Sequence, residues 1–151
     1  MANPDSVSQF YLDSFGGGRI AHADNVLFNT VANNVVQLPF LGGGLTNSGS
    51  ANTSGAVIVR RITINNPSGD VSGAYVTIST DAAGSNVVVA NVALTQINGT
   101  NKWTDLTIAA PYLAAVPING NTTQCLYVNV TTGSGNTNTA SIQVYGDVVK
   151  F

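Results

Sequence analysis

The stretch GAYVTIST, residues 73–80, decides the fold class because two kinds of side chain alternate along it. One set is small or apolar: Ala74, Val76 and Ile78. The other set carries hydroxyl groups: Tyr75, Thr77 and Ser79. Side chains of an extended chain point to opposite faces in turn, so this period of two predicts a strand with its apolar set on a core.

The same period recurs in NVVVANVALT, residues 86–95, and in ASIQVYGDVV, residues 140–149. In the first stretch, the expected inward residues are Val88, Ala90, Val92 and Leu94. In the second, they are Ile142, Val144 and Val148. Short alternating runs separated by turn residues are typical of antiparallel sheets rather than of parallel sheets covered by helices.

The composition agrees with an all-β chain. Val, Asn, Thr, Gly and Ser dominate, and charged residues make up 8% of the sequence, compared with about 25% in a typical soluble domain. We expect strands at 26–31, 35–40, 56–64, 73–80, 86–95, 103–109, 124–132 and 139–149. The predicted fold is an antiparallel β-sandwich of about eight strands, jelly-roll-like, with an extended N-terminal arm.

The first 25 residues lack sustained alternation. They combine the aromatic residues Phe10, Tyr11 and Phe15 with the glycine triplet 16–18. This contrast predicts an arm over residues 1–25 and a sandwich domain over residues 26–151. Residues 1–15 also lack the basic and apolar regions of a secretory signal, and no apolar run is long enough for a transmembrane helix.

The stretch SFGGGRIAHAD, residues 14–24, most resembles an active-site loop. A phosphate loop would require a lysine and a following helix, and neither is present. His22 and Asp24 lie on one side of an extended segment, but no G-x-S-x-G nucleophile motif accompanies them. We therefore expect no enzyme, no catalytic residues and no cofactor, and we interpret the glycines as a hinge.

Three further residue types are open to functional interpretation. Asp70 and Asp81 lie in turn sequences without calcium-loop spacing, which favours turn capping over a metal site. The sole cysteine, Cys125, is expected to be a half-buried structural thiol. Trp103, the sole tryptophan, shares the outward side of its strand with Asp105 and Thr107; we favour an edge-of-core position over a platform for sugars.

The charge balance excludes one class of partner. A net charge of −2, with only Arg60 and Arg61 adjacent, is too little positive charge for nucleic-acid binding. So few charges are typical of a chain packed against copies of itself or a partner, although an extracellular domain with a neutral polar surface is the alternative.

The stretches GAYVTISTDAAGSNVVVANVALTQINGTNKWTDLTIAAPYL and LYVNVTTGSGNTNTASIQVYGDVVKF resemble small virion proteins of tailed bacteriophages that decorate or cement the head. The resemblance covers roughly residues 56–150, and VYGDVV at 144–149 is its most specific part. It implies a jelly-roll-like sandwich on the outside of an icosahedral shell, commonly as trimers at local threefold positions.

On this basis we expect a structural virion protein made in the host cytoplasm. Its expected partners are the major capsid protein and copies of itself, as a homotrimer, with no nucleic acid and no membrane. The predicted interface residues are the arm anchors and hinge: Phe10, Tyr11, Phe15, Gly16, Gly17, Gly18, Arg19 and His22. The alternatives are a carbohydrate- or receptor-binding module using Trp103 or the 42–55 loop, and a self-assembling shell or pilus subunit.

Overall fold

The structure is a computed structural model that describes residues 12–13, 17–29, 35–39, 55–81, 83–109, 116–118 and 125–150. Every regular element in these residues is a β-strand. The strands are β1 (Leu12–Asp13), β2 (Gly17–Leu27), β3 (Val35–Pro39), β4 (Gly55–Asn65), β5 (Tyr75–Ser79), β6 (Val87–Ala93), β7 (Thr104–Leu106), β8 (Val116–Ile118), β9 (Cys125–Thr132) and β10 (Thr139–Lys150).

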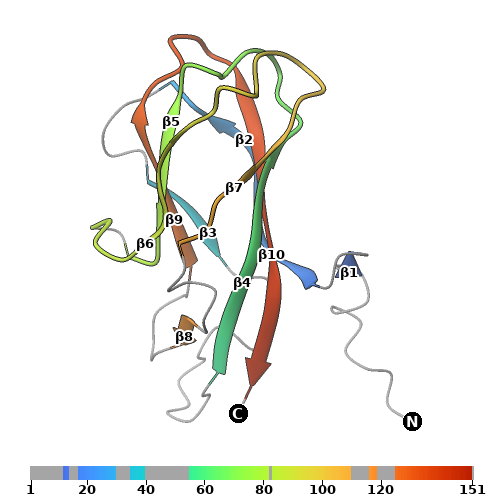
Figure 1. Ribbon diagram of the computed structural model, residues 1–151, viewed down its shortest axis with the longest axis vertical. Coiled ribbons are helices and arrows are strands. Elements are labelled where there is room, and N and C mark those ends of the chain that lie inside the picture. The colour runs from blue at the N-terminus through green and yellow to red at the C-terminus, as the bar shows by residue number, and fades with distance from the viewer. Residues whose placement is uncertain are drawn as a thin grey trace.

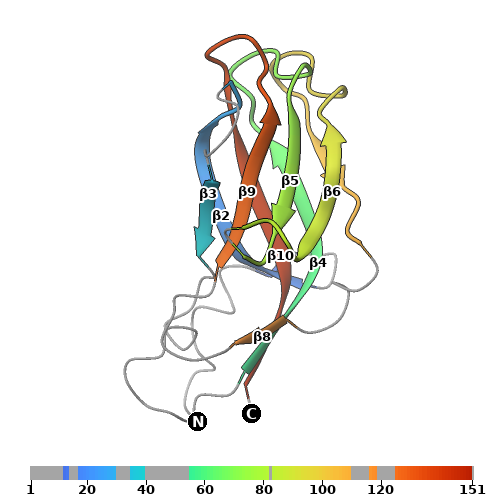
Figure 2. The ribbon, with the colours of Figure 1, turned by 90° about the vertical axis from the view of Figure 1, so that its left-hand side faces the viewer.

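The strands form two antiparallel sheets (Figures 1 and 2). The six-stranded sheet has the order β1-β2-β10-β4-β7, with β8 also paired to β4. The four-stranded sheet has the order β3-β9-β5-β6. In Figure 2 the four-stranded sheet lies in front of β2, β10 and β4, so the two sheets form two layers.

One cluster of buried apolar side chains fills the space between the layers. The six-stranded sheet contributes residues such as Ile62, Ile64, Ile142 and Val144, and the four-stranded sheet contributes Val76, Ile78, Leu126, Val128 and Val130. Full burial of such a side chain stabilises a fold by roughly 1.5–3 kcal/mol. The all-β, sandwich-like architecture and the inward set of residues 73–80 are therefore as predicted.

The predicted division of the chain at residue 25 is wrong for the described residues. β2 begins at Gly17 and lies between β1 and β10, so residues 17–25 belong to the six-stranded sheet. Of the strand expected at 26–31, only Val26 and Leu27 belong to β2; residues 28–29 are not in a strand, and residues 30–31 lie outside the described residues. Of the arm predicted over residues 1–25, residues 1–11 and 14–16 lie outside the described residues.

Two irregularities in β2 explain why its sequence lacks a simple alternation. The pairing with β10 shifts between Arg19 and Ala21, and both Ile20 and Ala21 are buried. The pairing shifts again between Ala23 and Val26, where Asn25 adopts a φ of 55°. β-bulges of this kind place consecutive side chains on one face and so interrupt the period of two.

The other seven expected strands coincide with β3, β4, β5, β6, β7, β9 and β10, while β1 and β8 are additional. Two face assignments are wrong. Ala90 is exposed, because the pairing of β6 with β5 shifts between Val89 and Val92. Ser79 is buried, next to another shift, and its hydroxyl donates to the carbonyl of Asp81 at 2.7 Å.

The described residues contain no helix of the length and hydropathy needed to cross a lipid bilayer.

Asp70 and Asp81 cap turns, as predicted. Asp70 accepts the backbone N–H of Ser72 at 2.8 Å. Asp81 accepts the N–H groups of Ser85 at 3.1 Å and Asn86 at 2.7 Å. Because these bonds favour the charged carboxylate, they lower the pKa of Asp81 below 3.8, and bonds from Ser72 lower the pKa of Asp70 in the same way.

Replacing Asp81 with asparagine is expected to make thermal stability less sensitive to acid. Folding lowers the pKa of this group, so its contribution is present above pH 3.8 and is lost as the pH falls through the folded-state pKa. The melting temperatures of wild type and Asp81→Asn, at neutral pH and at about pH 2.5, measure the effect. The melting temperature of wild type should fall more on acidification than that of Asp81→Asn. Equal decreases in the two proteins would contradict the turn-capping role of Asp81.

Candidate functional site

Charge is distributed unequally between the two sheets. Every charged residue that falls in a described strand belongs to the six-stranded sheet: Asp13, Arg19, Asp24, Arg60, Arg61, Asp105, Asp147 and Lys150. The sole histidine, His22, is also in this sheet, on β2. The four strands of the other sheet contain no charged residue. The outer faces of the two sheets therefore differ in the partners that they can accept.

The floor of the candidate site is the outward face of β4. Arg61, Thr63 and Asn65 alternate along this strand with the core residues Ile62 and Ile64, and Thr63 is itself buried. On one side of β4, Tyr145 of β10 pairs with Arg61, and Gln143 pairs with Thr63. The Tyr145 hydroxyl donates to the Gln143 amide oxygen. The residues of the floor and of β10 thus form one continuous polar surface.

Asp105 of β7, on the other side of β4, binds two side chains of the floor. Its Oδ1 accepts a hydrogen bond from Arg61 Nε at 2.9 Å and another from Thr63 Oγ1 at 2.6 Å. The Arg61 guanidinium also lies 5.5 Å from the centre of the Tyr145 ring, a cation–π distance. Arg61 is therefore fixed between a carboxylate and an aromatic ring, and most of its charge is balanced.

A β-bulge explains why two adjacent arginines both lie on this face. The pairing of β4 with β10 shifts between Tyr145 and Gly146, which oppose Arg61 and Val59 and leave Arg60 as the extra residue. Arg60 pairs with Asp147 of β10. Its side chain is 53% exposed and that of Asp147 is 37% exposed, so this pair adds little stability and mainly orients its partners.

The predicted edge-of-core position for Trp103 is wrong. Trp103 is 58% exposed, more than any other large apolar side chain in the described residues. It immediately precedes β7, in which Leu106 is buried and Asp105 is exposed. The expected alternation is correct, since Trp103, Asp105 and Thr107 are all exposed, and this alternation directs the indole away from the core.

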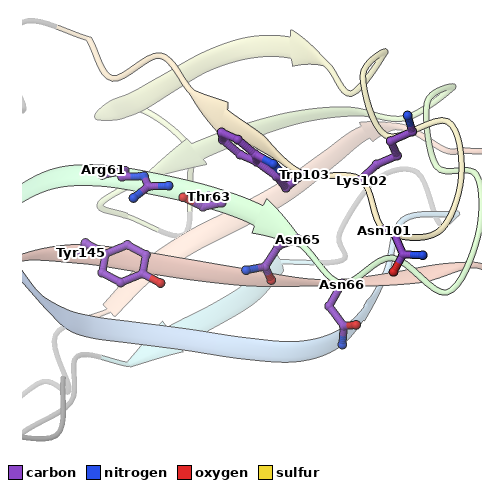
Figure 3. A pocket seen from close by; sticks show the side chains of 8 residues that line it. All are labelled: Arg61, Thr63, Asn65, Asn66, Asn101, Lys102, Trp103 and Tyr145. Atoms are coloured by element: carbon purple, nitrogen blue, oxygen red, sulfur yellow. The ribbon is translucent and has the colours of Figure 1, made fainter. Parts of the chain in front are cut away.

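These residues surround a shallow open groove of about 470 Å³ (Figure 3). Strands β4 and β10 contribute to it, together with the residue that follows β4 and the residues that precede β7. The lining consists of Arg61, Thr63, Asn65, Asn66, Asn101, Lys102, Trp103 and Tyr145. Figure 3 shows Trp103 on one side of β4 and Tyr145 on the other, with Thr63 and Asn65 between them. The groove thus has an aromatic residue on each flank and a floor of amides and hydroxyls.

None of the predicted interface residues that the structure describes lines this groove, although Arg19 pairs in register with Tyr145 of β10. Gly17 and Gly18 begin β2 and pair with β1, and Arg19 and His22 follow on the same strand. His22 pairs in register with Gln143 of β10. The other predicted interface residues lie outside the described residues: Phe10, Tyr11, Phe15 and Gly16.

The contacts of His22 do not form a catalytic pair. His22 Nε2 lies 4.0 Å from Asp24 Oδ2, beyond hydrogen-bond distance. Its Nδ1 is buried and has no hydrogen-bond partner among the described residues. The described residues also contain no group of three or more His, Cys, Asp or Glu side chains that could hold a metal ion. Cys125 begins β9; the predicted half-burial of its thiol concerns a side chain that the structure does not describe.

Sequence reasoning did not find the groove, because its lining comes from distant parts of the chain. The adjacent arginines and the outward Trp103 were visible in the sequence. Their proximity depends on the pairing of Ile64 with Thr104 and of Arg61 with Tyr145, which only the folded sheet provides.

Comparisons of the chain with protein-family models, with characterised proteins and with solved structures found no match. The function proposed below therefore rests on the residues quoted for the phage resemblance and on the geometry of the two sheets.

Proposed function

We propose that the two sheets form an eight-stranded jelly roll to which β1 and β8 are additions. Among the other eight strands, the first pairs with the last, and the remaining pairs follow inward: β2 with β10, β3 with β9, β4 with β7 and β5 with β6. A long antiparallel ribbon wrapped into two layers produces this order. Jelly rolls occur in viral capsid proteins and in lectins, so the fold is compatible with structural and with binding functions.

We further propose that the chain is a structural virion protein that binds the outer surface of a tailed-phage capsid and cements neighbouring capsid subunits. The observation that carries this proposal is the charge-free outer face of the four-stranded sheet. The buried centres of protein interfaces are depleted in charge and enriched in tyrosine. Tyr75, which is 40% exposed on β5, lies on this face.

The hydrogen bonds of this face favour a rigid surface. Thr131 of β9 donates to the side chain of Asn91 on β6, across the intervening β5. The Thr131 hydroxyl also lies 3.3 Å from the backbone carbonyl oxygen of Tyr75 on β5, so all three strands meet at this side chain. Side chains that such bonds hold in place lose little conformational entropy on docking.

Cementing would arise from many modest contacts. Each copy would bridge neighbouring capsid subunits, and the resistance of the shell would grow with the number of bridges. We propose that the arm residues Phe10, Tyr11 and Phe15 supply a second contact and that copies assemble as trimers. β1, which follows Phe10 and Tyr11 in the sequence, is an edge strand of the six-stranded sheet.

Binding to phage heads that lack this protein tests the docking face. Tyr75→Asp places an unpaired charge in the proposed interface and is expected to weaken binding by at least about tenfold. Asn66→Asp is the matched control, because it adds the same charge beside the other sheet, at an exposed position with a φ of 49° that aspartate tolerates. Co-sedimentation of each folded variant with the heads measures the bound fraction.

Equal binding of Tyr75→Asp and wild type would exclude the four-stranded sheet as the docking face. Weakening by Asn66→Asp alone would place the interface on the six-stranded sheet instead. Light scattering after size-exclusion chromatography tests the trimer, which requires a mass three times that of one chain.

A further inference from the structure

We propose that the groove between Trp103 and Tyr145 is a binding site for a neutral carbohydrate. It lies on the outer face of the six-stranded sheet, whereas the proposed capsid contact uses the four-stranded sheet. The two proposals are therefore independent, and either can fail without the other.

The indole of Trp103 is placed where a ligand can stack on it. Trp103 is 58% exposed, so most of its apolar surface adds nothing to the core. Its position before β7 places it beside Asn65, because Thr104 pairs with Ile64. The C–H face of a sugar ring is apolar and weakly positive, and it stacks on the electron-rich face of an aromatic ring. Trp103 offers such a face to a ligand in the groove.

The amides of the lining match the chemistry of a sugar. Asn65, Asn66 and Asn101 bring three amide side chains to the lining. An amide both donates and accepts hydrogen bonds, as does each hydroxyl of a sugar, so the two groups are complementary. Asn65 Oδ1 is buried and has no hydrogen-bond partner among the described residues, so a rotation of this amide would present an unused acceptor to a ligand hydroxyl.

Backbone conformation helps to hold two of these amides in place. Asn66 has a φ of 49° and Asn101 a φ of 59°. Both are left-handed conformations, which asparagine tolerates better than most residues. They fix the turns that follow β4 and precede β7, from which Asn66 and Asn101 line the groove (Figure 3).

The positive charge of the lining is partly neutralised. The Arg61 guanidinium is balanced by Asp105, and the same carboxylate oxygen also accepts the hydroxyl of Thr63. Lys102 is the other charged residue of the lining, and it is exposed. A lining with three amides and a neutralised arginine favours a hydroxyl-rich neutral ligand over an acidic one.

The extent of the groove favours an oligosaccharide over a single sugar. Trp103 lies beside Asn65, and Tyr145 pairs with Arg61, four residues along β4. At the rise of a strand, four residues span roughly 13 Å, and the two intervening strand spacings add a width of roughly 10 Å. The aromatic flanks therefore face a surface longer than one sugar ring.

A glycan array followed by fluorescence titration tests the proposal. Trp103 is the sole tryptophan, so a bound sugar should change the intrinsic fluorescence of this residue alone. We expect neutral oligosaccharides among the array hits and a saturable fluorescence change with the purified hit. In a calorimetric titration of the same sugar, Trp103→Ala should weaken binding by roughly 30-fold or more, and Asn101→Ala should weaken it less.

Tyr75→Ala is the matched control, because it removes an exposed aromatic ring from the opposite sheet and should leave the affinity unchanged. An array without a neutral hit would overturn the proposal. So would a hit whose affinity is the same in wild type and Trp103→Ala. Binding restricted to acidic sugars and lost in Lys102→Ala would overturn the assignment of a neutral ligand.

Discussion

Gly146→Ala is expected to leave little folded protein. A Cβ at this position would lie 1.9 Å from the carbonyl oxygen of Ile58 and 3.0 Å from Cδ1 of Ile20. β10 lies between β2 and β4, so the strand cannot move away from β4 without being pressed against β2. The nearest obstacle is backbone, which side-chain rotation cannot relieve. We expect a loss of about 4 kcal/mol or more, a large part of the stability of a typical domain.

Gly99→Ala is the matched control for this substitution. A Cβ at Gly99 would have no neighbour within 4 Å, and the change should alter the unfolding free energy by no more than about 0.5 kcal/mol. Denaturant unfolding of both variants measures the difference. A Gly146→Ala protein within about 1 kcal/mol of wild type would contradict the strand register at the centre of the six-stranded sheet.

Removal of residues 2–16 is expected to abolish capsid decoration while both sheets remain folded. The deletion ends at residue 16 because Gly17 begins β2. It removes the three proposed aromatic anchors together with β1, which has only two residues. Loss of several aromatic contacts at one interface weakens binding by about 100-fold or more. Co-sedimentation with undecorated heads measures binding, and the unfolding midpoint checks the fold.

A full-length variant distinguishes the effect of losing the aromatic anchors from the effect of losing β1. Phe10, Tyr11 and Phe15 are all replaced by alanine in this variant, which should bind as poorly as the truncated chain. If the truncated chain decorates heads as completely as wild type, the arm has no role in attachment.

The sequence predicted the strands where alternation is uninterrupted. β5, β9 and most of β10 have one apolar and one polar face, and their inward residues are Val76, Ile78, Leu126, Val128, Ile142 and Val144. For such segments, burial of one face is sufficient to specify the strand and its orientation.

The N-terminal strand was missed because bulges conceal its period. Ile20 and Ala21 are consecutive and both buried, so residues 17–25 do not show a period of two. The glycines before them were interpreted as a hinge. Gly18 instead pairs with Leu12 on one side and with Gly146 on the other. Bulges depend on the neighbouring strands, which a local sequence pattern does not reveal.

The candidate site was only partly predictable for a related reason. The outward direction of Trp103 followed from alternation with Leu106. The groove itself depends on pairing between residues as far apart as Arg61 and Tyr145. The charge difference between the two sheets is likewise visible only once each strand is assigned to its sheet.

The most direct test of the central claim is a comparison of phage heads with and without this protein by electron cryomicroscopy. We expect added density on the outer surface of the head, with the four-stranded sheet toward the shell and the groove at Trp103 toward solvent. Heads that are identical in the two samples, or density for this chain at a fibre tip, would contradict it.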